Sequence, residues 1–552
     1  MKQKLILTVA IFCITINAFS QWQTYPFAPA GSVLNFPLDD GKHTALTTTT
    51  EWWYINLHLI GSAPAYKKYD VMLCYFSKPA NMRIFNIADP VSGVFHTDVN
   101  QTPFTFSQQT GHWDLTYTIP FSISDYSRWT FPTSNETFTY FFHAVSPANN
   151  DGLDVSVTSN RTPLIVGGNG FIPLGGAGDS SFYYSYSNMK VEGSIKYSGI
   201  VDSISSGIAW IDRQWGPFTV GVNSSNMYEW FSLQMDKPGT TLGIPQTPSE
   251  FNIWQIFSDS TNVPYDRAYR LVSGIYPDNS QDTISNFIFE RTGYWYDPVN
   301  HKYYSQGWRL INPSKGINID MTPAIQNQVI NVTLFKFWEG STILKGTVEN
   351  QPVDGLGFAE LVAARSTPIT IPSVPGNITI TPFTNHYSVN WSTSTQGTYP
   401  IGGYRVFRSA SNDGYWQYIA TTTNLSYNDF SASADTGYFY TVTSFDNQTH
   451  TSASAYANAV WVDPLSSGVN QMVVSDRSIK VYPNPATDKI TMEVPEFKNT
   501  SLEILSMDGR VLKNISLQSE KTQLNISNLA KGIYILKVKN DKKIITKKLI
   551  KQ

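Results

Sequence analysis

Short β-rich runs separated by turn residues recur along the whole chain, and segments with the spacing of an amphipathic helix are scarce. Such runs include residues 69–76, 137–144, 251–257 and 283–290, with Gly, Pro, Asn and Ser between runs. Side chains alternate between the two faces of a strand, so short runs of this kind are typical of strands. The sequence therefore predicts an all-β protein made of sandwiches or barrels.

The composition limits the classes of partner. The chain has 552 residues, a formal net charge of −3, 15% charged residues and 14% aromatic residues. This length predicts three or four domains. The low charge argues against nucleic acid as a partner and against an electrostatic membrane patch. No stretch beyond the N-terminus approaches about 18 consecutive apolar residues, so we expect no transmembrane segment.

The N-terminus predicts a signal peptide. Two lysines precede an apolar stretch at residues 5–16, and residues 18–20 form a small-x-small cleavage site. Cys13 lies inside this segment, so Cys74 is the only cysteine of the mature chain. An intrachain disulfide and a zinc site built on several thiolates are therefore excluded.

Residues 481–552 carry an ordered set of motifs. Tyr482-Pro483-Asn484-Pro485 opens the segment, turns follow at residues 508–509 and 531–532, and the end is rich in lysine. The apolar runs between these turns predict a small all-β module. The motifs closely resemble the type A sorting domain of the type IX secretion system. This resemblance implies a Bacteroidetes-type cell, the type IX secretion machinery as a partner, and a secreted or cell-surface location.

A separate strand pattern precedes the sorting segment. Residues 388–391 place a Trp on an early strand, residues 402–408 form a central strand, and residues 435–442 place tyrosines at the start of a late strand. These features resemble a fibronectin type III domain. We favour a spacer role over a binding role, and we interpret the polar residues 463–478 as a linker.

Three clusters in the N-terminal part combine carboxylates with indoles, at residues 51–59, 207–216 and 228–236. In the first, a strand would put Trp52, Tyr54, Asn56 and His58 on one face and Glu51, Trp53, Ile55 and Leu57 on the other. In the second, Trp210 and Asp212 would share a face, and Arg213 would lie on the opposite one.

A carboxyl group beside an aromatic wall loses solvation, so its pKa rises and it can hold a proton near neutral pH. That property suits proton delivery to an alkene. From spacing alone, an ion pair between Asp212 and Arg213 is the favoured alternative, and the tryptophans are core residues by default. The eight histidines have no metal-ligand spacing, and the sequence has no nucleophile elbow or phosphate-binding loop.

Four motifs follow one another along residues 45–363: residues 51–54, 95–96, 183–185 together with 191–193, and 209–216. In this order they resemble the CrtC/AttH family, which includes carotenoid 1,2-hydratases. The resemblance implies two lipocalin-type barrels with a hydrophobic pocket for an isoprenoid or polyene-type lipophile. It also implies a hydro-lyase, or an isomerase or cyclase, that needs no metal or redox cofactor.

The resemblance makes Asp212 or Glu51 the candidate acid. The candidate substrate-binding side chains are Trp52, Tyr54, Trp210, Trp215, Trp230 and His58. Many relatives have His after the motif Asp, whereas this chain has Arg213, a permanent cation that cannot shuttle protons. The departure favours Asp212 as an ionised, paired group.

The predicted organisation is a signal peptide (1–20), a first lipocalin-like domain (21–216), a second (217–366), a fibronectin type III domain (367–462), a linker (463–478) and a sorting domain (479–552). The alternative function is a non-catalytic lipophile-binding or surface adhesion protein. A carbohydrate-binding role is a third hypothesis, and it would require the tryptophans to be exposed on an outer face.

Overall fold

The computed structural model describes residues 28–36, 38–79, 81–101, 105–107, 113–118, 126–131, 139–159, 161–174, 179–218, 226–239, 244–246, 248–258, 263–264, 270–332, 336–448, 450–452, 458–465, 479–495, 497, 499–506, 510–539 and 544–552. The predicted signal peptide, residues 466–478 of the predicted linker and the turn at residues 508–509 lie outside these ranges. The chain forms two compact units, Met1–Leu465 and Ser466–Gln552.

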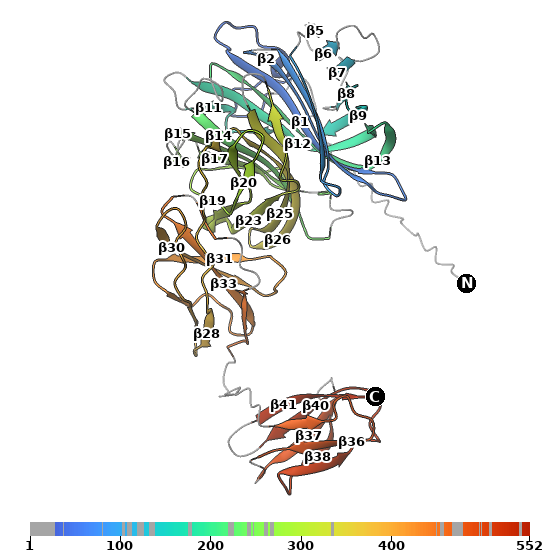
Figure 1. Cartoon of the computed structure of the whole chain (residues 1–552), viewed down its shortest axis with the longest axis vertical. Coiled ribbons are helices and arrows are strands. Elements are labelled where there is room, and N and C mark those ends of the chain that lie inside the picture. The colour runs from blue at the N-terminus through green and yellow to red at the C-terminus, as the bar shows by residue number, and fades with distance from the viewer. Residues whose placement is uncertain are drawn as a thin grey trace, which may run out of the picture. The chain divides into compact units, whose positions relative to one another are not determined.

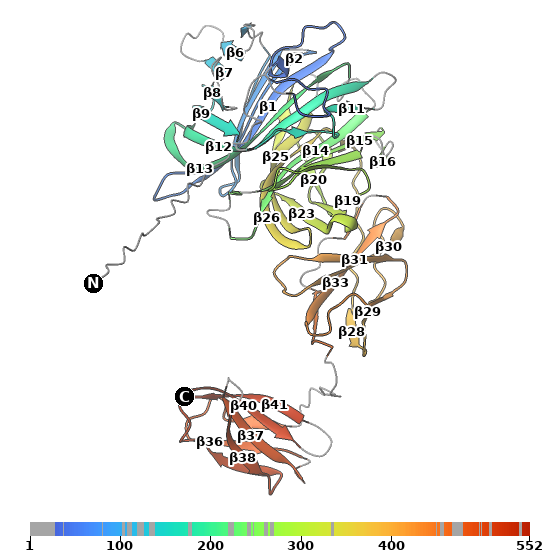
Figure 2. The same cartoon turned by 180° about the vertical axis from the view of Figure 1, so that it is seen from behind.

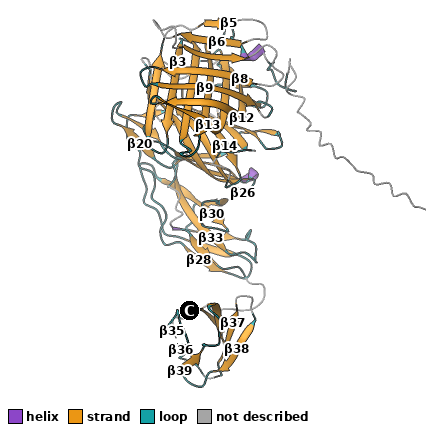
Figure 3. Cartoon of the chain, turned by 90° about the vertical axis from the view of Figure 1, so that its right-hand side faces the viewer, coloured by secondary structure: helices purple, strands orange, loops and turns teal. Residues whose placement is uncertain are grey.

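Strands make up almost all of the regular secondary structure in the described residues, and loops and turns join them, as Figure 3 shows. In the described ranges, helical structure is limited to short 3-10 turns such as Leu38–Asp40 and Pro313–Lys315. No described helix has the length and apolar character needed to cross a membrane. The prediction of an all-β protein is therefore confirmed.

The first large sheet is antiparallel and has the order β4-β3-β2-β1-β13-β12-β9-β8-β7-β6-β5, with β10 and β11 also paired to β12. Its strands are β1 (Thr50–Gly61), β2 (Lys68–Lys78), β3 (Met82–Asp89), β4 (Val94–Asn100), β5 (Thr105–Ser107), β6 (Trp113–Thr118), β7 (Tyr126–Phe131), β8 (Thr139–Ser146), β9 (Asp151–Ser159), β10 (Leu164–Ile165), β11 (Phe171–Pro173), β12 (Ser180–Tyr197) and β13 (Ile200–Gly216).

The second large sheet has the order β18-β17-β15-β14-β26-β25-β23-β22-β19, with β16 paired to β15 and β24 to β25. Its strands are β14 (Asn226–Asp236), β15 (Ser249–Ser258), β16 (Val263–Pro264), β17 (Arg270–Ile275), β18 (Gln281–Ile284), β19 (Ile288–Arg291), β22 (Trp308–Asn312), β23 (Ile317–Pro323), β24 (Val329–Asn331), β25 (Lys336–Val348) and β26 (Gln351–Leu361). A small sheet of β20 (Tyr294–Asp297), β21 (Lys302–Ser305) and β27 (Ala364–Arg365) accompanies it.

Each large sheet curls around an apolar core of its own, and a third core fills the layer between the two sheets (Figures 1 and 2). Strand β1 illustrates the arrangement. Trp53, Ile55 and Leu57 enter the core of the first sheet, whereas Trp52 and Tyr54 enter the shared layer. The alternation predicted for this strand is confirmed, and the two curled sheets agree with the predicted pair of lipocalin-like barrels.

A seven-stranded sandwich completes the first unit, with a three-stranded sheet (β28-β29-β32) and a four-stranded sheet (β31-β30-β33-β34). Its strands are β28 (Thr379–Pro382), β29 (Tyr387–Asn390), β30 (Ile401–Ser409), β31 (Gln417–Thr422), β32 (Ser426–Asp429), β33 (Tyr438–Asp446) and β34 (Val460–Val462). This is the region that we predict to be a fibronectin type III domain.

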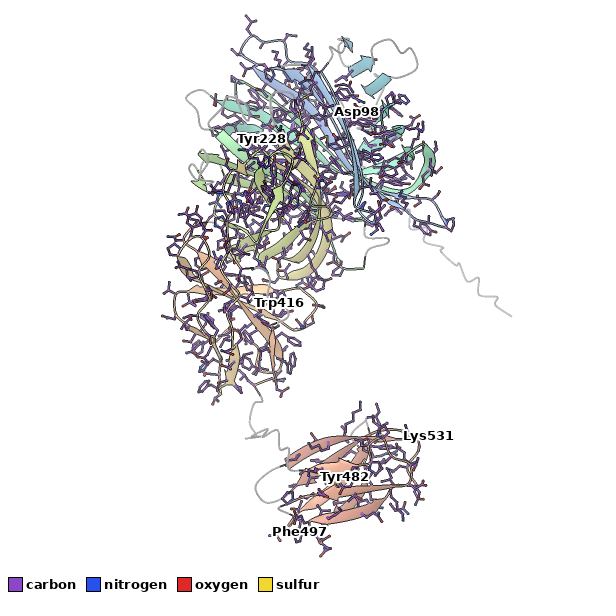
Figure 4. The ribbon with its side chains drawn as sticks, viewed as in Figure 1. Asp98, Tyr228, Trp416, Tyr482, Phe497 and Lys531 are labelled. Atoms are coloured by element: carbon purple, nitrogen blue, oxygen red, sulfur yellow. The ribbon has the colours of Figure 1, made fainter. Side chains whose placement is uncertain are left out.

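The sandwich packs directly on the second sheet. Ile311 of β22 shares a small buried core with Phe407 and Trp416, and Figure 4 labels Trp416 at this end of the sandwich. Arg405 Nε donates a 3.0 Å hydrogen bond to Glu290 Oε2, and both side chains are buried. The sandwich, which we predict to be a spacer, therefore contacts the second barrel through buried side chains and is not joined to it by the connecting polypeptide alone.

The second unit is a small sandwich around one apolar core. One sheet has the order β35-β36-β39, and the other has the order β38-β37-β40-β41. Its strands are β35 (Lys480–Tyr482), β36 (Lys489–Glu493), β37 (Ser501–Ser506), β38 (Val511–Ser516), β39 (Lys521–Asn525), β40 (Gly532–Lys539) and β41 (Ile544–Lys551). The small C-terminal β-sandwich predicted from the motifs is thus present.

Candidate functional site between the two sheets

Two cross-strand rows of side chains face each other in the layer between the large sheets. The row on the first sheet crosses β2, β1, β13 and β12 and consists of Cys74, Tyr54, Asp212 and Ser185. The row on the second sheet crosses β25, β26, β14 and β15 and consists of Glu339, Glu360, Trp230 and Trp254. The rows meet where the Tyr54 and Trp230 rings pack edge to face, with centroids 5.3 Å apart.

A cavity of about 290 Å³, counting the space at its open side, lies at one end of these rows. Its walls are mostly aromatic or aliphatic, and Figure 4 labels one of them, Tyr228. The lining side chains are Trp52, Tyr54, Met72, Cys74, Phe76, Ile84, Tyr228, Phe337, Glu339 and Glu360. Burial raises the pKa of the Cys74 thiol, so this group remains neutral.

Asp212 is buried and accepts hydrogen bonds on both oxygens. Tyr183 donates to Oδ2 at 2.6 Å, Ser185 to Oδ1 at 2.5 Å and Trp210 Nε1 to Oδ1 at 2.7 Å. Burial raises the pKa of Asp212 to about 7, although these three donors oppose the shift. Arg213 points to the opposite face and pairs with Glu51, so the predicted Asp212–Arg213 ion pair is wrong.

Glu339 and Glu360 are direct partners across β25 and β26. Tyr228 donates a 2.6 Å hydrogen bond to Glu360 Oε1, and the Tyr54 hydroxyl interacts with the Glu339 carboxyl. Burial raises the pKa of both carboxyls, and the negative charge of Glu360 raises that of Glu339 further. Within the described part of the chain, no Lys, Arg or His forms an ion pair with these two groups or with Asp212.

Glu51 lies on the other face of β1, inside the first barrel. Its Oε1 is 2.7 Å from Arg213 Nη2 and 3.0 Å from His43 Nδ1. Burial raises the pKa of Glu51, but the Arg213 charge and the His43 hydrogen bonds outweigh it and lower the pKa to about 2. An ionised carboxylate with these partners is unsuited to the general-acid role predicted for Glu51.

The second barrel repeats this arrangement. Glu229 of β14 precedes Trp230 as Glu51 precedes Trp52, and it also points into its own barrel. Its two oxygens accept hydrogen bonds of 2.9 Å from Nε and Nη2 of Arg291. In the described structure, the interior of each barrel therefore contains a buried Glu–Arg ion pair formed by the glutamate of the Glu-Trp motif.

The remaining predicted binding residues divide into two groups. Trp52 and Tyr54 line the cavity, and Trp210 and Trp230 belong to the apolar layer around it. Trp215 instead enters the first barrel, where its ring stacks on His43 with centroids 4.0 Å apart. The structure thus separates Trp215 from the cavity.

His58 faces the second sheet but lies farther along β1. Its Nδ1 is 2.7 Å from Asp70 Oδ1, and its ring packs near Phe358. This geometry fits the structural alternative, a buried hydrogen-bonded histidine. Trp52, Trp210 and Trp230 are 9%, 0% and 2% exposed, so they do not form an outer carbohydrate-binding face.

Glu339 and Glu360 were missed by sequence reasoning. Each lies in an apolar run, at residues 337–339 and 358–361. Charged residues are rarely buried, so a glutamate in such a strand indicates a candidate functional residue. Their pairing, however, depends on the register of β25 and β26.

In the described residues, no group of three His, Cys, Asp or Glu side chains is placed to hold a metal ion.

A family profile described as AttH-like matches residues 28–364, which include both large sheets and the cavity. The chain belongs to the AttH-like family. A second profile, described as a secretion system C-terminal sorting domain, matches residues 480–552. This domain directs the AttH-like chain through type IX secretion to the cell surface or the extracellular space, as the motifs predicted.

One relative of this AttH-like chain is kievitone hydratase of Fusarium solani subsp. phaseoli. It is 24% identical over 225 residues, which cover 39% of this chain and 58% of the relative. Similar solved structures include an AttH-type protein of Nitrosomonas europaea, at 20% identity and a TM-score of 0.48, and kievitone hydratase of Nectria haematococca, at 17% and 0.45. Each covers 62% of this chain, with 100% and 99% of its own length.

Proposed function

We propose that this protein adds water to a carbon–carbon double bond of a lipophilic, isoprenoid-type molecule bound between the two sheets. The observation that carries the proposal is a set of buried carboxyl groups beside an apolar, aromatic cavity, with raised pKa and with no cationic partner among the residues that the structure describes. Membership of the AttH-like family and the similarity to kievitone hydratase support a hydratase-type reaction.

The chemistry follows from the walls of the cavity. A neutral carboxyl donates its proton to one alkene carbon, and a tertiary cation forms at the other. The faces of aromatic rings such as Trp52, Tyr54 and Phe337 stabilise that cation. Water then attacks the cation, and its extra proton passes to a carboxylate, so the net change is the addition of one water molecule.

The size of the cavity suggests which part of a ligand it holds. The figure of about 290 Å³ includes the open space at the mouth, so the enclosed part of the cavity is much smaller than the roughly 300–1,000 Å³ of a pocket that holds a whole drug-sized ligand. A branched isoprenoid end fits this space better than a whole polyene or polycyclic molecule. The remainder of a longer ligand would extend through the open side of the cavity.

The proposed site keeps part of the predicted set of residues. Asp212 remains a candidate catalytic group, and Trp52, Tyr54, Trp210 and Trp230 remain candidate binding residues. Glu339 and Glu360 join them because they line the cavity. Glu51, Trp215 and His58 are left outside the site by their positions.

The test uses the purified full chain, incubated with a lipid and polyene extract and followed by mass spectrometry. We expect the wild-type chain to form a product heavier by one water. We expect each of the variants Asp212→Asn, Glu339→Gln and Glu360→Gln to form less of this product than the wild type. Glu192→Gln is the matched control, because this carboxylate is exposed and pairs with Lys190 on the surface. An unchanged compound that co-purifies with all five proteins would instead support the non-catalytic carrier.

A further inference from the structure

Glu339 and Glu360 form a cross-strand pair of carboxyl groups in the site. They occupy directly opposed positions on neighbouring antiparallel strands, and both side chains line the cavity. Opposed Cβ atoms in such a pair are about 4.5–5.5 Å apart. Two carboxylates at this separation in an apolar layer repel each other strongly, so the pair retains one proton near neutral pH.

The two members of the pair differ in how completely their oxygens are hydrogen-bonded. Tyr228 donates a 2.6 Å hydrogen bond to Glu360, which stabilises the ionised form of that carboxyl. The Tyr54 hydroxyl interacts with the Glu339 carboxyl in a similar way, but Glu339 is 3% exposed and its Oε1 has no hydrogen-bond partner among the described residues. The shared proton is therefore best placed on Glu339, next to the space that a ligand would fill.

Asp212 has a different environment. Its two oxygens already accept three hydrogen bonds, from Tyr183, Ser185 and Trp210. It is absent from the cavity wall, whereas Tyr54, its partner across β1 and β13, lines it. Asp212 is thus well placed to orient Tyr183 and Trp210, and less well placed to reach a ligand.

We propose that Glu339 and Glu360 are the acid and the base of this site, and that Asp212 is a positioning residue. This inference rests on the proposed hydration. The Glu339 O–H bond breaks as a C–H bond forms with the alkene electrons, and the attacking water forms the C–O bond. Glu360 accepts the water proton, which then passes to Glu339 across the pair and restores the starting state.

The first experiment needs no substrate. Infrared spectroscopy of the full chain at neutral pH measures the carbonyl band of protonated carboxyl groups, which isotope exchange in deuterium oxide shifts. We expect Glu339→Gln to remove one protonated carboxyl and Asp212→Asn to leave the pair's band in place. A neutral-pH spectrum that is unchanged in both Glu339→Gln and Glu360→Gln would overturn the proton-sharing pair.

The second experiment uses any compound that the wild-type protein hydrates. We expect Glu339→Gln and Glu360→Gln each to lower kcat by about 10²–10⁴-fold. Asp212→Asn should lower kcat less and raise KM, with the shape of the pH profile unchanged. Loss of activity confined to Asp212→Asn would contradict the assignment and return the acid role to that residue.

The two proposals fail in distinguishable ways. If the wild-type chain hydrates nothing while the infrared result is as expected, the proton-sharing pair stands and the hydratase function fails. If hydration occurs but both glutamine variants remain active, the hydratase function stands and the acid–base assignment fails. Far-ultraviolet circular dichroism of each variant, with Glu192→Gln as the reference, establishes that the comparison is made between folded proteins.

Discussion

Glu51 and Asp212 lie on neighbouring strands and are both buried, yet their surroundings differ completely. Glu51 faces the interior of the first barrel and contacts Arg213 and His43. Asp212 faces the layer between the sheets, and its hydrogen-bond donors among the described residues are all neutral. The same contrast holds in the second barrel, between Glu229 with its Arg291 partner and the Glu339–Glu360 pair.

The contrast separates structural from chemical uses of a buried carboxyl. An Arg partner keeps the group ionised and unreactive toward proton transfer, because the opposite charge favours the ionised form. A buried carboxyl without a cation holds its proton to higher pH, and this lowers stability at neutral pH. Ionisable groups with strongly shifted pKa cluster at functional sites. The unpaired carboxyls therefore point to the cavity between the sheets as the functional site.

We expect the largest effect when the Glu51–Arg213 ion pair inside the first barrel is broken. Arg213→Met leaves Glu51 buried without its cation and removes the guanidinium from the Trp53 ring, which lies 4.0 Å away. We expect unfolding free energy to fall by about 5 kcal/mol, the upper end for such a loss, measured by urea denaturation at neutral pH. The double variant Glu51→Gln/Arg213→Met should recover part of that loss, and a fall below about 1 kcal/mol in the single variant would contradict the comparison.

The next largest effect concerns Asp212, whose carboxyl lies in the layer between the two sheets. The pKa of Asp212 rises from 3.8 to about 7 on folding, so the folded state holds this proton more tightly than the unfolded state. Stability is therefore lost as pH rises from 3.8 to 7, by about 4 kcal/mol in total. Denaturation of Asp212→Asn across this interval should lack this component of the slope, and identical slopes in the two proteins would refute the raised pKa.

Glu51 should show the opposite sign. Its pKa falls from 4.5 to about 2 on folding, so its contribution is present above pH 4.5 and is lost as pH falls toward 2. The loss amounts to about 3 kcal/mol, and Glu51→Gln should remove it. Acid denaturation of the two proteins checks this, and an unchanged acid midpoint would show that Glu51 is not held by Arg213.

The smallest effect is expected where the sandwich meets the second barrel. Arg405→Met leaves Glu290 without its partner at a site that is 5–7% exposed, and we expect a cost of about 2 kcal/mol. Limited proteolysis should then cut the connection between the second sheet and the sandwich more readily. Lys190→Ala, in an exposed pair, is the control and should change stability by less than about 0.5 kcal/mol.

Much of the fold could be predicted from local patterns. The alternation in residues 51–59 placed Trp52 and Tyr54 on one face and Trp53 on the other, and the structure has this arrangement. The same rule already put Asp212 and Arg213 on opposite faces. The predicted ion pair between them relied on their adjacent positions in the sequence. Side chains of adjacent residues in a strand, however, point to opposite faces.

The sequence by itself determined the all-β character, the sorting domain and the secreted location, because period-two alternation and turn motifs are local properties. Only the tertiary structure decided which carboxyls are paired. Arg213 reaches Glu51 across 162 positions of chain, and Glu339 meets Glu360 through the register of two strands. A carboxyl's pKa depends on burial and on the charges around it in space, and neither is written in the order of its neighbours.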